Sequence, residues 1–368
     1  MNRFARQTIL PGFGKEGQEK LASARILVVG AGGLGCPVLL HLAAAGIGTI
    51  GIADGDSINE SNLNRQTLFG QQHIGMPKAE TAAAILKEKY PDITFRVFPE
   101  FLNPQNALEV IGDYDLVLDG SDNFGTRYLV NDACVLLEKP LVMGAIYQYE
   151  GQVMVFNFGK DPVNYRDLYP DHPQGQQVPN CSETGVLGVL PGIIGTLQAT
   201  EAIKVLTGIG KVLAGKMLFY NMKDAAFYEI AVQHNPLSRK KIPVSIEAFR
   251  SKNYDINCGT PEEISWEKAM DWTRNMDSSL LVDIREPQEE PLIEKEGIIK
   301  IPMGNLREDP ERLSHYENVL LFCRSGQRSG ILATELKQRF PEKKIFSVKG
   351  GILHPSSPLN STENETKT

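Results

Sequence analysis

The sequence predicts an α/β protein with two domains of unequal size, each built on a mostly parallel sheet. In the first half of the 368-residue chain, short β-branched runs alternate with segments of helical periodicity. This alternation is typical of a parallel sheet covered by helices on both faces. The same pattern returns on a smaller scale after residue 260, and the chain length is ordinary for two or three domains.

The elements of the first domain follow in order. We expect strands at 25–29, 49–54, 94–98, 116–119, 141–145, 215–220 and 226–232, and helices at 37–45, 78–89 and 185–206. Residues 157–185 hold four prolines among polar residues, which predicts a long functional or disordered loop. Periodicity fades again at 246–260, so the sequence predicts a first domain over 1–245 and a linker after it.

The second domain is expected over residues 261–356. Its strands are predicted at 280–283, 319–322 and 344–348, and a helix at 329–340. The polar residues 357–368 have the composition of a disordered tail.

Composition excludes several classes of protein. A net charge of −7 argues against nucleic-acid binding driven by phosphate neutralisation. No apolar run of signal-peptide length follows Met1, and the longest uncharged stretch, 184–200, contains Pro191 and is too short for a convincing membrane span. The five cysteines are scattered and form no Cys-x-x-Cys pair. We therefore expect a cytoplasmic protein without nucleic-acid or membrane partners.

A glycine-rich loop follows the first strand. Gly30, Gly32 and Gly35 have the spacing G-x-G-x-x-G, with Gly33 inside the motif. Such a loop allows close approach of phosphate to free N–H groups at a helix start. Asp54 ends the next strand, where a carboxylate can bind ribose hydroxyls. Taken alone, this pattern favours an NAD(P)-dependent oxidoreductase.

The neighbouring polar residues favour a triphosphate instead. Arg65 and Lys78 would neutralise phosphate oxygens, and Asp122 could hold Mg²⁺. A nicotinamide site needs an apolar slot and few cations.

Six segments carry a resemblance to a known family. They are Arg6-Gln7-Ile9-Leu10, Gly30–Gly35, Ser61-Asn62-Leu63-Asn64-Arg65-Gln66, Gly75-Met76-Pro77-Lys78, Asp119-Gly120-Ser121-Asp122-Asn123 and Glu150-Gly151-Gln152. Through them, residues 1 to about 245 resemble the MoeB/ThiF family of sulfur-carrier adenylyltransferases, relatives of the ubiquitin-activating enzymes.

The resemblance implies a Rossmann-like adenylation domain. It would use ATP and Mg²⁺ to adenylate the C-terminal glycine of a ubiquitin-like carrier that ends in Gly-Gly. The resemblance implies Asp54 for ribose, Asn62, Arg65 and Lys78 for phosphates and Asp122 for Mg²⁺. The other residues implied around the nucleotide are Gly30, Gly32, Gly33, Gly35, Gln66 and Asn123. Arg6 matches an arginine that reaches the partner subunit's active site, which implies a homodimer.

The family's zinc ligands are replaced in this sequence. Most relatives bind a structural zinc with two Cys-x-x-Cys pairs, which map here onto Asn164 and Asp167 and onto Ser238 and Lys241. None of the four is a thiolate, so we expect no zinc.

Cys323 is the strongest candidate nucleophile. Cys323-Arg324-Ser325-Gly326-Gln327-Arg328 lies between a strand and a helix, where N–H groups and Arg328 would stabilise a sulfur anion. The loop has one residue fewer than Cys-x5-Arg phosphate loops, which suits a single sulfur. With Asp283-Ile284-Arg285-Glu286-Pro287 and Lys349-Gly350-Gly351, the segment resembles a rhodanese domain.

The two resemblances together imply adenylation followed by rhodanese-assisted sulfur transfer, with a sulfur donor as a further partner. Cys181 matches a family cysteine that forms a transient link to the carrier, although an inert loop cysteine is the alternative. The expected carrier is the molybdopterin synthase small subunit, with the thiamine-pathway carrier second. An NAD(P)-dependent oxidoreductase and a non-catalytic carrier-binding platform remain as alternatives.

Overall fold

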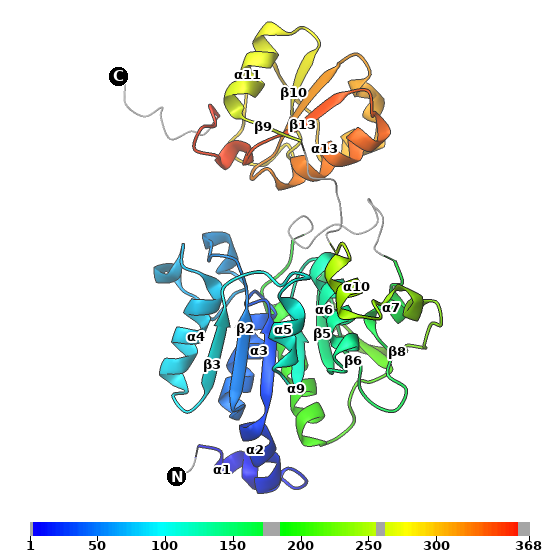
Figure 1. Cartoon of the computed structure of the whole chain (residues 1–368). Coiled ribbons are helices and arrows are strands. Elements are labelled where there is room, and N and C mark those ends of the chain that lie inside the picture. The colour runs from blue at the N-terminus through cyan, green and yellow to red at the C-terminus, as the bar shows by residue number, and fades with distance from the viewer. Residues whose placement is uncertain (1–2, 172–184, 255–261, 360–368) are drawn as a thin grey trace. The chain divides into compact units, whose positions relative to one another are not determined.

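The computed structural model describes residues 3–171, 185–254 and 262–359. The chain divides into two compact units, Met1–Asp255 (unit 1) and Ile256–Thr368 (unit 2), and each has its own sheet (Figure 1). The expected α/β fold class is confirmed. Helix α10 (Ile246–Ser251) lies within the expected linker but belongs to unit 1, where Phe249 is fully buried. Residues 255–260 of that segment lie outside the described residues.

Unit 1 contains a sheet with the strand order β3-β2-β1-β4-β5-β6-β7-β8. The strands are β1 (Arg25–Val29), β2 (Thr49–Ala53), β3 (Thr94–Phe98), β4 (Leu116–Asp119), β5 (Leu141–Tyr147), β6 (Glu150–Phe156), β7 (Lys216–Asn221) and β8 (Ala226–Ala231). β1 to β5 are parallel, and β6, β7 and β8 are antiparallel to their neighbours. The strand order reverses between β1 and β4, which is where ligands bind in open α/β sheets.

Helices cover both faces of this sheet. They are α1 (Ala5–Thr8), α2 (Gly14–Ser23), α3 (Gly35–Ala45), α4 (Lys78–Lys89), α5 (Ala107–Gly112), α6 (Phe124–Leu136), α7 (Tyr165–Leu168), α9 (Val189–Thr207) and α10, with 3-10 turns η1 (Glu60–Asn62), η2 (Gln71–His73) and η3 (Ser238–Lys241). Ile26 and Val28 of β1 pack into one core with α3 and α9, whereas Leu27 and Val29 pack into the other with α6. α7 lies in the stretch 157–185 that was expected to be irregular.

Helix α9 is long and apolar enough to cross a membrane by length and composition, and it is the one such helix among the described residues. It packs on α3, β5 and β6, with Leu190, Ile194 and Ala199 buried in the core of unit 1. These contacts are those of a core helix.

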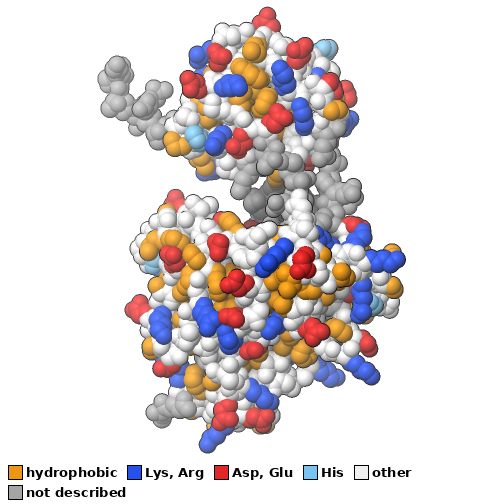
Figure 2. All heavy atoms as spheres, in the orientation of Figure 1, with side chains coloured by type: hydrophobic (Ala, Val, Ile, Leu, Met, Phe, Trp, Pro, Cys, Tyr) orange, Lys and Arg blue, Asp and Glu red, His pale blue; other side chains and the backbone are white. Residues whose placement is uncertain are grey.

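Unit 2 is a smaller α/β unit whose strands are all parallel, in the order β11-β10-β12-β13-β9. Its strands are β9 (Glu263–Ile264), β10 (Ser279–Asp283), β11 (Ile298–Lys300), β12 (Asn318–Phe322) and β13 (Lys344–Val348), and its helices are α11 (Trp266–Asn275), α12 (Met303–Glu308) and α13 (Gln327–Arg339), with turns η4 (Pro310–Leu313) and η5 (Gly351–Leu353). On the face of unit 1 seen in Figure 2, acidic and basic side chains are interspersed rather than gathered by sign.

Candidate functional site

The glycine loop between β1 and α3 is packed so tightly that side chains are excluded. Gly30 has a φ of +89°, and a Cβ there would lie 3.1 Å from the carbonyl oxygen of Gly120. A Cβ on Gly35 would lie 1.9 Å from the carbonyl oxygen of Gly30. The loop therefore needs glycine at both positions, and it turns the first N–H groups of α3 toward the edge of the sheet.

Asp54 fixes the glycine loop from the end of β2. Its Oδ2 accepts the N–H of Ala31 at 2.7 Å, and its Oδ1 accepts the N–H of Asp56 at 2.8 Å. Burial raises the pKa of Asp54, and the nearby Lys78 charge opposes this shift. Each carboxylate oxygen has a second lone pair, so Asp54 can hold the loop and still accept a hydroxyl.

The segment after η1 lies against the same loop. A Cβ on Gly33 would be 3.5 Å from Cγ of Arg65, and one on Gly32 would be 3.7 Å from Nε2 of Gln66. Gln66 is buried, and its Oε1 has no hydrogen-bond partner. An orphaned buried acceptor is costly, so this cradle fits a polar ligand such as a nucleotide. Asn62 accepts the N–H of Asn59 within its own turn, at 3.2 Å.

Lys78, the first residue of α4, is held by a carboxylate that the sequence analysis did not single out. Its Nζ lies 2.9 Å from Oδ2 of Asp56, and the Lys78 side chain is only 8% exposed. The signal that could have found Asp56 is its spacing from Asp54, because both follow β2 in one loop. This pair fixes the direction of the expected phosphate-binding amine.

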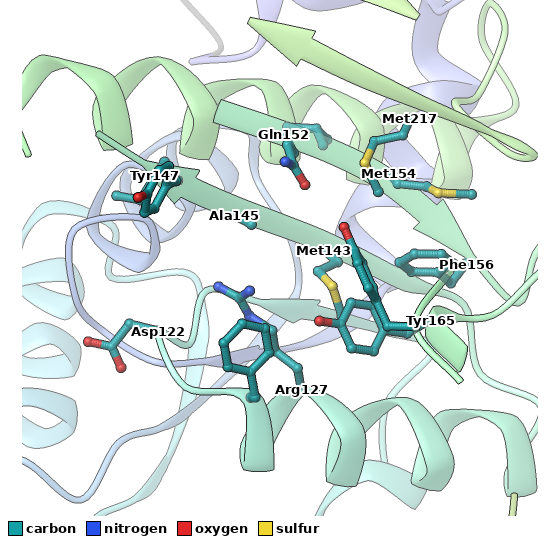
Figure 3. A pocket seen from close by; sticks show the side chains of 14 residues that line it. Asp122, Arg127, Met143, Ala145, Tyr147, Gln152, Met154, Phe156, Tyr165 and Met217 are labelled. Atoms are coloured by element: carbon teal, nitrogen blue, oxygen red, sulfur yellow. The ribbon is translucent and has the colours of Figure 1, made fainter. Parts of the chain in front are cut away.

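A pocket extends from Asp122 along the sheet. Figure 3 shows Asp122 at one end, Phe156 and Tyr165 at the other, and the Arg127 side chain pointing in from α6. Arg127 is 9% exposed and donates to the carbonyl of Ser121 at 3.2 Å. Arg127 was not predicted from the sequence, although it follows Asn123 by one helical turn.

The residues around Asp122 fit a magnesium ion only together with phosphates. Asp122 is exposed, whereas Asn123 caps α6 by accepting the N–H of Thr126 at 2.8 Å. Within the described parts of the chain, no group of three or more His, Cys, Asp or Glu side chains could hold a metal. Mg²⁺ commonly takes one or two carboxylates and completes its shell with phosphate oxygens and water.

One expected site residue, Arg6, is not brought to this cradle. Arg6 is exposed on α1, and its neighbour Phe4 packs at Gly46, the end of α3 remote from the glycine loop. Cys181 lies outside the described residues. Cys36 and Cys134 are buried, and burial raises the pKa of Cys36 to about 12.

The four positions mapped from zinc ligands carry a polar cluster instead. Oδ1 of Asp167 accepts the hydroxyl of Ser238 at 2.6 Å, and its Oδ2 accepts the side-chain amide of Asn164 at 2.8 Å. Lys241 pairs with Asp171. Asn164 and Ser238 both donate to Asp167, whose Oδ1 also lies 3.1 Å from Nδ1 of His234. None of the four mapped positions carries a thiolate or an imidazole, so these positions do not fit the four-thiolate set of a structural zinc.

The Cys323 loop in unit 2 rests on a pair of glycines. A Cβ on Gly351 would lie 2.3 Å from the carbonyl oxygen of Cys323, and Gly326 has a φ of +88°. The Cys323 side chain is 1% exposed, with the hydroxyl of Ser329 at 3.6 Å from its sulfur. Arg324 and Ser325 are exposed, and α13 begins at Gln327, so N–H groups of its first turn have no acceptor within the helix. The Arg328 guanidinium pairs with the carboxylate of Glu289, with Nη1 and Oε1 at 2.5 Å.

Known proteins match this chain over nearly its whole length. The chain is 40% identical over 368 residues to the probable adenylyltransferase/sulfurtransferase MoeZ of Mycobacterium tuberculosis, covering 95% of this chain and 91% of MoeZ. It is 37% identical to the adenylyltransferase and sulfurtransferase MOCS3 of Drosophila ananassae, covering 97% and 85% of the two chains. Over 240 residues it is 51% identical to a sulfur carrier protein adenylyltransferase of Thermus thermophilus, covering 64% of this chain and 89% of that one.

A crystal structure of E. coli MccB has the same fold, with a TM-score of 0.58 at 20% identity, covering 64% of this chain and 73% of that one. The ThiF family matches residues 4–240, which hold every glycine-loop contact described above. On this match and on the similarity to MoeZ and MOCS3 along nearly the whole chain, the protein belongs to the ThiF family.

Proposed function

We propose that this enzyme adenylates the C-terminal glycine of a ubiquitin-like sulfur carrier and then takes part in converting it to a thiocarboxylate. The carrier carboxylate attacks the α-phosphorus of ATP, pyrophosphate leaves, and an acyl-adenylate remains. The observation that carries the proposal is the convergence of the glycine loop, Arg65 and the Lys78–Asp56 pair at the β1/β4 reversal. The named relatives support the same pair of activities.

Each residue of the site in unit 1 has a proposed role that follows from the chemistry of its side chain. The loop N–H groups, Arg65 and Lys78 would bind phosphate oxygens, Asp54 the ribose, and Asp122 a Mg²⁺ ion held between carboxylate and phosphates. The pocket beside Asp122 is mostly apolar with one cation, Arg127, which suits the last residues of a carrier and their terminal carboxylate.

The sulfur step would use Cys323. Its thiolate takes the outer sulfur of a donor such as thiosulfate, releasing sulfite and leaving a persulfide. The terminal persulfide sulfur attacks the acyl carbon, expels AMP and leaves an acyl disulfide. A second thiol, for which Cys181 is the candidate, attacks the Cys323 sulfur and releases the thiocarboxylate, leaving a disulfide that a reductant reopens.

The carrier, the assembly and the compartment belong to the same proposal. We favour the molybdopterin synthase small subunit as carrier, with the thiamine-pathway carrier second. A homodimer would let Arg6 act in the neighbouring subunit, which agrees with its distance from the cradle of its own chain. A cytoplasmic location fits the unpaired thiols of Cys36, Cys134 and Cys323.

The deciding experiment is mass spectrometry of each candidate carrier after incubation with the full chain, ATP, Mg²⁺, thiosulfate and dithiothreitol. Replacement of one oxygen by sulfur at the carrier C-terminus is expected for the true substrate. A carrier that ends in Gly-Ala serves as the matched control. Binding of NAD(P)H with no consumption of ATP would replace the proposal with an oxidoreductase, and carrier binding without ATP consumption would replace it with a platform.

A further inference from the structure

Asp56 contacts Lys78 through its side chain and through its main chain. Nζ of Lys78 lies 2.9 Å from Oδ2 of Asp56, and the backbone N–H of Lys78 donates to the carbonyl of Asp56 at 2.9 Å. A lysine amine is a point charge on a flexible stem and has no preferred direction of its own. The two contacts to one residue therefore give this amine its direction.

The loop that carries Asp56 is fixed against the segment that leads into α4. The N–H of Ile58 donates to the carbonyl of Met76 at 2.9 Å, and the carbonyl of Ile58 accepts the N–H of Gly75 at 2.8 Å. These backbone bonds hold the two segments side by side. The Asp56 carboxylate is therefore carried by a loop whose backbone is tied to the start of α4.

The other side of Asp56 is bonded to the residues around the glycine loop. Its N–H donates to Oδ1 of Asp54 at 2.8 Å, and Oδ2 of Asp54 accepts the N–H of Ala31 at 2.7 Å. One chain of hydrogen bonds thus runs from the glycine loop through Asp54 and Asp56 to the amine of Lys78.

The exposure of the Lys78–Asp56 pair argues for a role in orientation rather than in stability. The Lys78 side chain is 8% exposed and that of Asp56 is 56% exposed. An ion pair with a half-exposed partner is open to water and contributes little to the stability of a fold. It still restricts the rotation of the buried lysine stem, which is what a positioned charge needs.

Arg65, the other cation proposed to bind phosphate, has a separate support. Its Nη1 donates to the carbonyl of Ser61 at 2.9 Å and to Oδ1 of Asn64 at 3.1 Å, both within its own turn. The contribution of Asp56 to one cation can therefore be separated from the other by combining mutations.

We propose that Asp56 is a positioning residue for adenylation, which holds the Lys78 amine in the direction in which it meets the phosphates of ATP. Asp56 acts only through that amine, so its removal cannot cost more than removal of Lys78 itself. This inference rests on the proposed adenylation by unit 1.

The first test is ATP–pyrophosphate exchange by the full chain at saturating ATP, with the molybdopterin synthase small subunit as carrier. Asp56→Ala should lose about three- to tenfold, because a displaced charge stabilises the α-phosphate poorly. Added to Lys78→Ala, the same substitution should change the rate by less than about 1.5-fold, whereas added to Arg65→Ala it should keep its full effect. Glu60→Ala removes an exposed acid from the same loop and is the matched control.

A loss in the Lys78→Ala background equal to that in the wild type would assign Asp56 a general structural role and overturn the proposal. An unchanged or faster rate in Asp56→Ala would also overturn it. If Asp56→Ala does not fold, Asp56→Asn goes through the same two combinations. It keeps the shape without the charge and should lose at least about twofold.

The second test needs no adenylation: trace acetylation of the nucleotide-free full chain with acetic anhydride, read on the Lys78 peptide by mass spectrometry. Lys89, exposed at the end of α4, is the internal reference. Asp56→Ala should raise the labelling of Lys78 relative to Lys89 at least about threefold, because the amine is released from a charge-assisted pair. Unchanged labelling would overturn the positioning role. A wild-type chain without exchange would instead overturn the proposed function, so the two failures are distinguishable.

Discussion

The hydroxyl of Ser238 donates a hydrogen bond to the carboxylate of Asp167 at 2.6 Å. The same carboxylate accepts the N–H of Asn235 at 2.8 Å and the side-chain amide of Asn164 at 2.8 Å. One buried acid thereby joins α7 to the segment that leads into α10. The Asp167 carboxylate and two of its hydrogen-bond partners, Asn164 and Ser238, thus stand at positions where the family resemblance implies zinc thiolates.

Replacement of Asp167 should therefore weaken unit 1. Asp167→Asn keeps the volume but turns an acceptor into a donor toward Ser238 and the Asn235 amide, and we expect a loss of about 2–4 kcal/mol in the free energy of unfolding. Far-UV circular dichroism in urea measures this. Tryptophan fluorescence would miss it, because Trp266 and Trp272 both lie in unit 2.

The control for this variant is Asp161→Asn, an exposed acid before α7, which should change stability by less than about 0.5 kcal/mol. Incubation with a strong zinc chelator should leave the wild-type urea midpoint unchanged. A chelator that lowers the midpoint as far as Asp167→Asn does would mean that a metal stabilises this region.

The periodic elements were predictable because their apolar patterns are local. The strand at 94–98 and the helix at 78–89 have the expected bounds, since their ends coincide with turns and caps that the sequence displays. Helix α10 was missed because it has only six residues and depends on one buried aromatic, Phe249. Helix α7 was missed for a similar reason: it is one turn long and is capped by Asn164 within a proline-rich stretch.

The site residues were predictable where the type of a residue and its spacing along the chain indicate its role, as in the glycine loop. It was not predictable where a group acts through a partner distant in sequence. Lys78 and Asp56 are 22 residues apart, and Arg328 and Glu289 are 39 residues apart. The sequence motifs contain the cations Lys78 and Arg328. The carboxylates that pair with them, Asp56 and Glu289, come close only in the folded chain.

Removal of either of the two cations proposed to bind phosphate should slow adenylation. Arg65→Ala and Lys78→Ala should each lose at least about tenfold in ATP–pyrophosphate exchange, because preorganised cations stabilise the charge that develops on the α-phosphate. The matched control is Lys89→Ala, at the exposed end of the same helix α4. Wild-type exchange rates in both variants would show that Arg65 and Lys78 do not bind the phosphates of ATP.

Alkaline pH should destabilise unit 1 through its buried tyrosines. Burial raises the pKa values of Tyr128, Tyr165 and Tyr254, that of Tyr165 to about 12. An unfolded tyrosine ionises near pH 10, so above that pH the native state binds more protons and its stability falls. The stabilisation should be complete below about pH 10 and be lost as the pH rises through the native pKa values.

Tyr254→Phe tests whether stability falls with rising pH for this reason. Its hydroxyl donates to Asp132 at 2.9 Å, so the variant should lose about 1–2 kcal/mol at pH 8 and show a shallower fall in stability between pH 10 and 11. Tyr228→Phe, on the exposed strand β8, is the control and should leave the slope unchanged. An unchanged slope in Tyr254→Phe would show that this tyrosine does not contribute to alkaline unfolding.

Cys323→Ser should separate the two proposed reactions. The glycine cradle lies in unit 1 and Cys323 lies in unit 2, so the substitution leaves every residue of the cradle unchanged. We expect carrier-dependent ATP–pyrophosphate exchange within about twofold of the wild type, since the contacts that stabilise the α-phosphate remain. With thiosulfate as donor, the carrier should gain no sulfur, because a hydroxyl forms no persulfide. Cys258→Ser is the matched control and should support both reactions. If Cys323→Ser yields thiocarboxylate at the wild-type rate, sulfur reaches the acyl-adenylate by a route that bypasses unit 2.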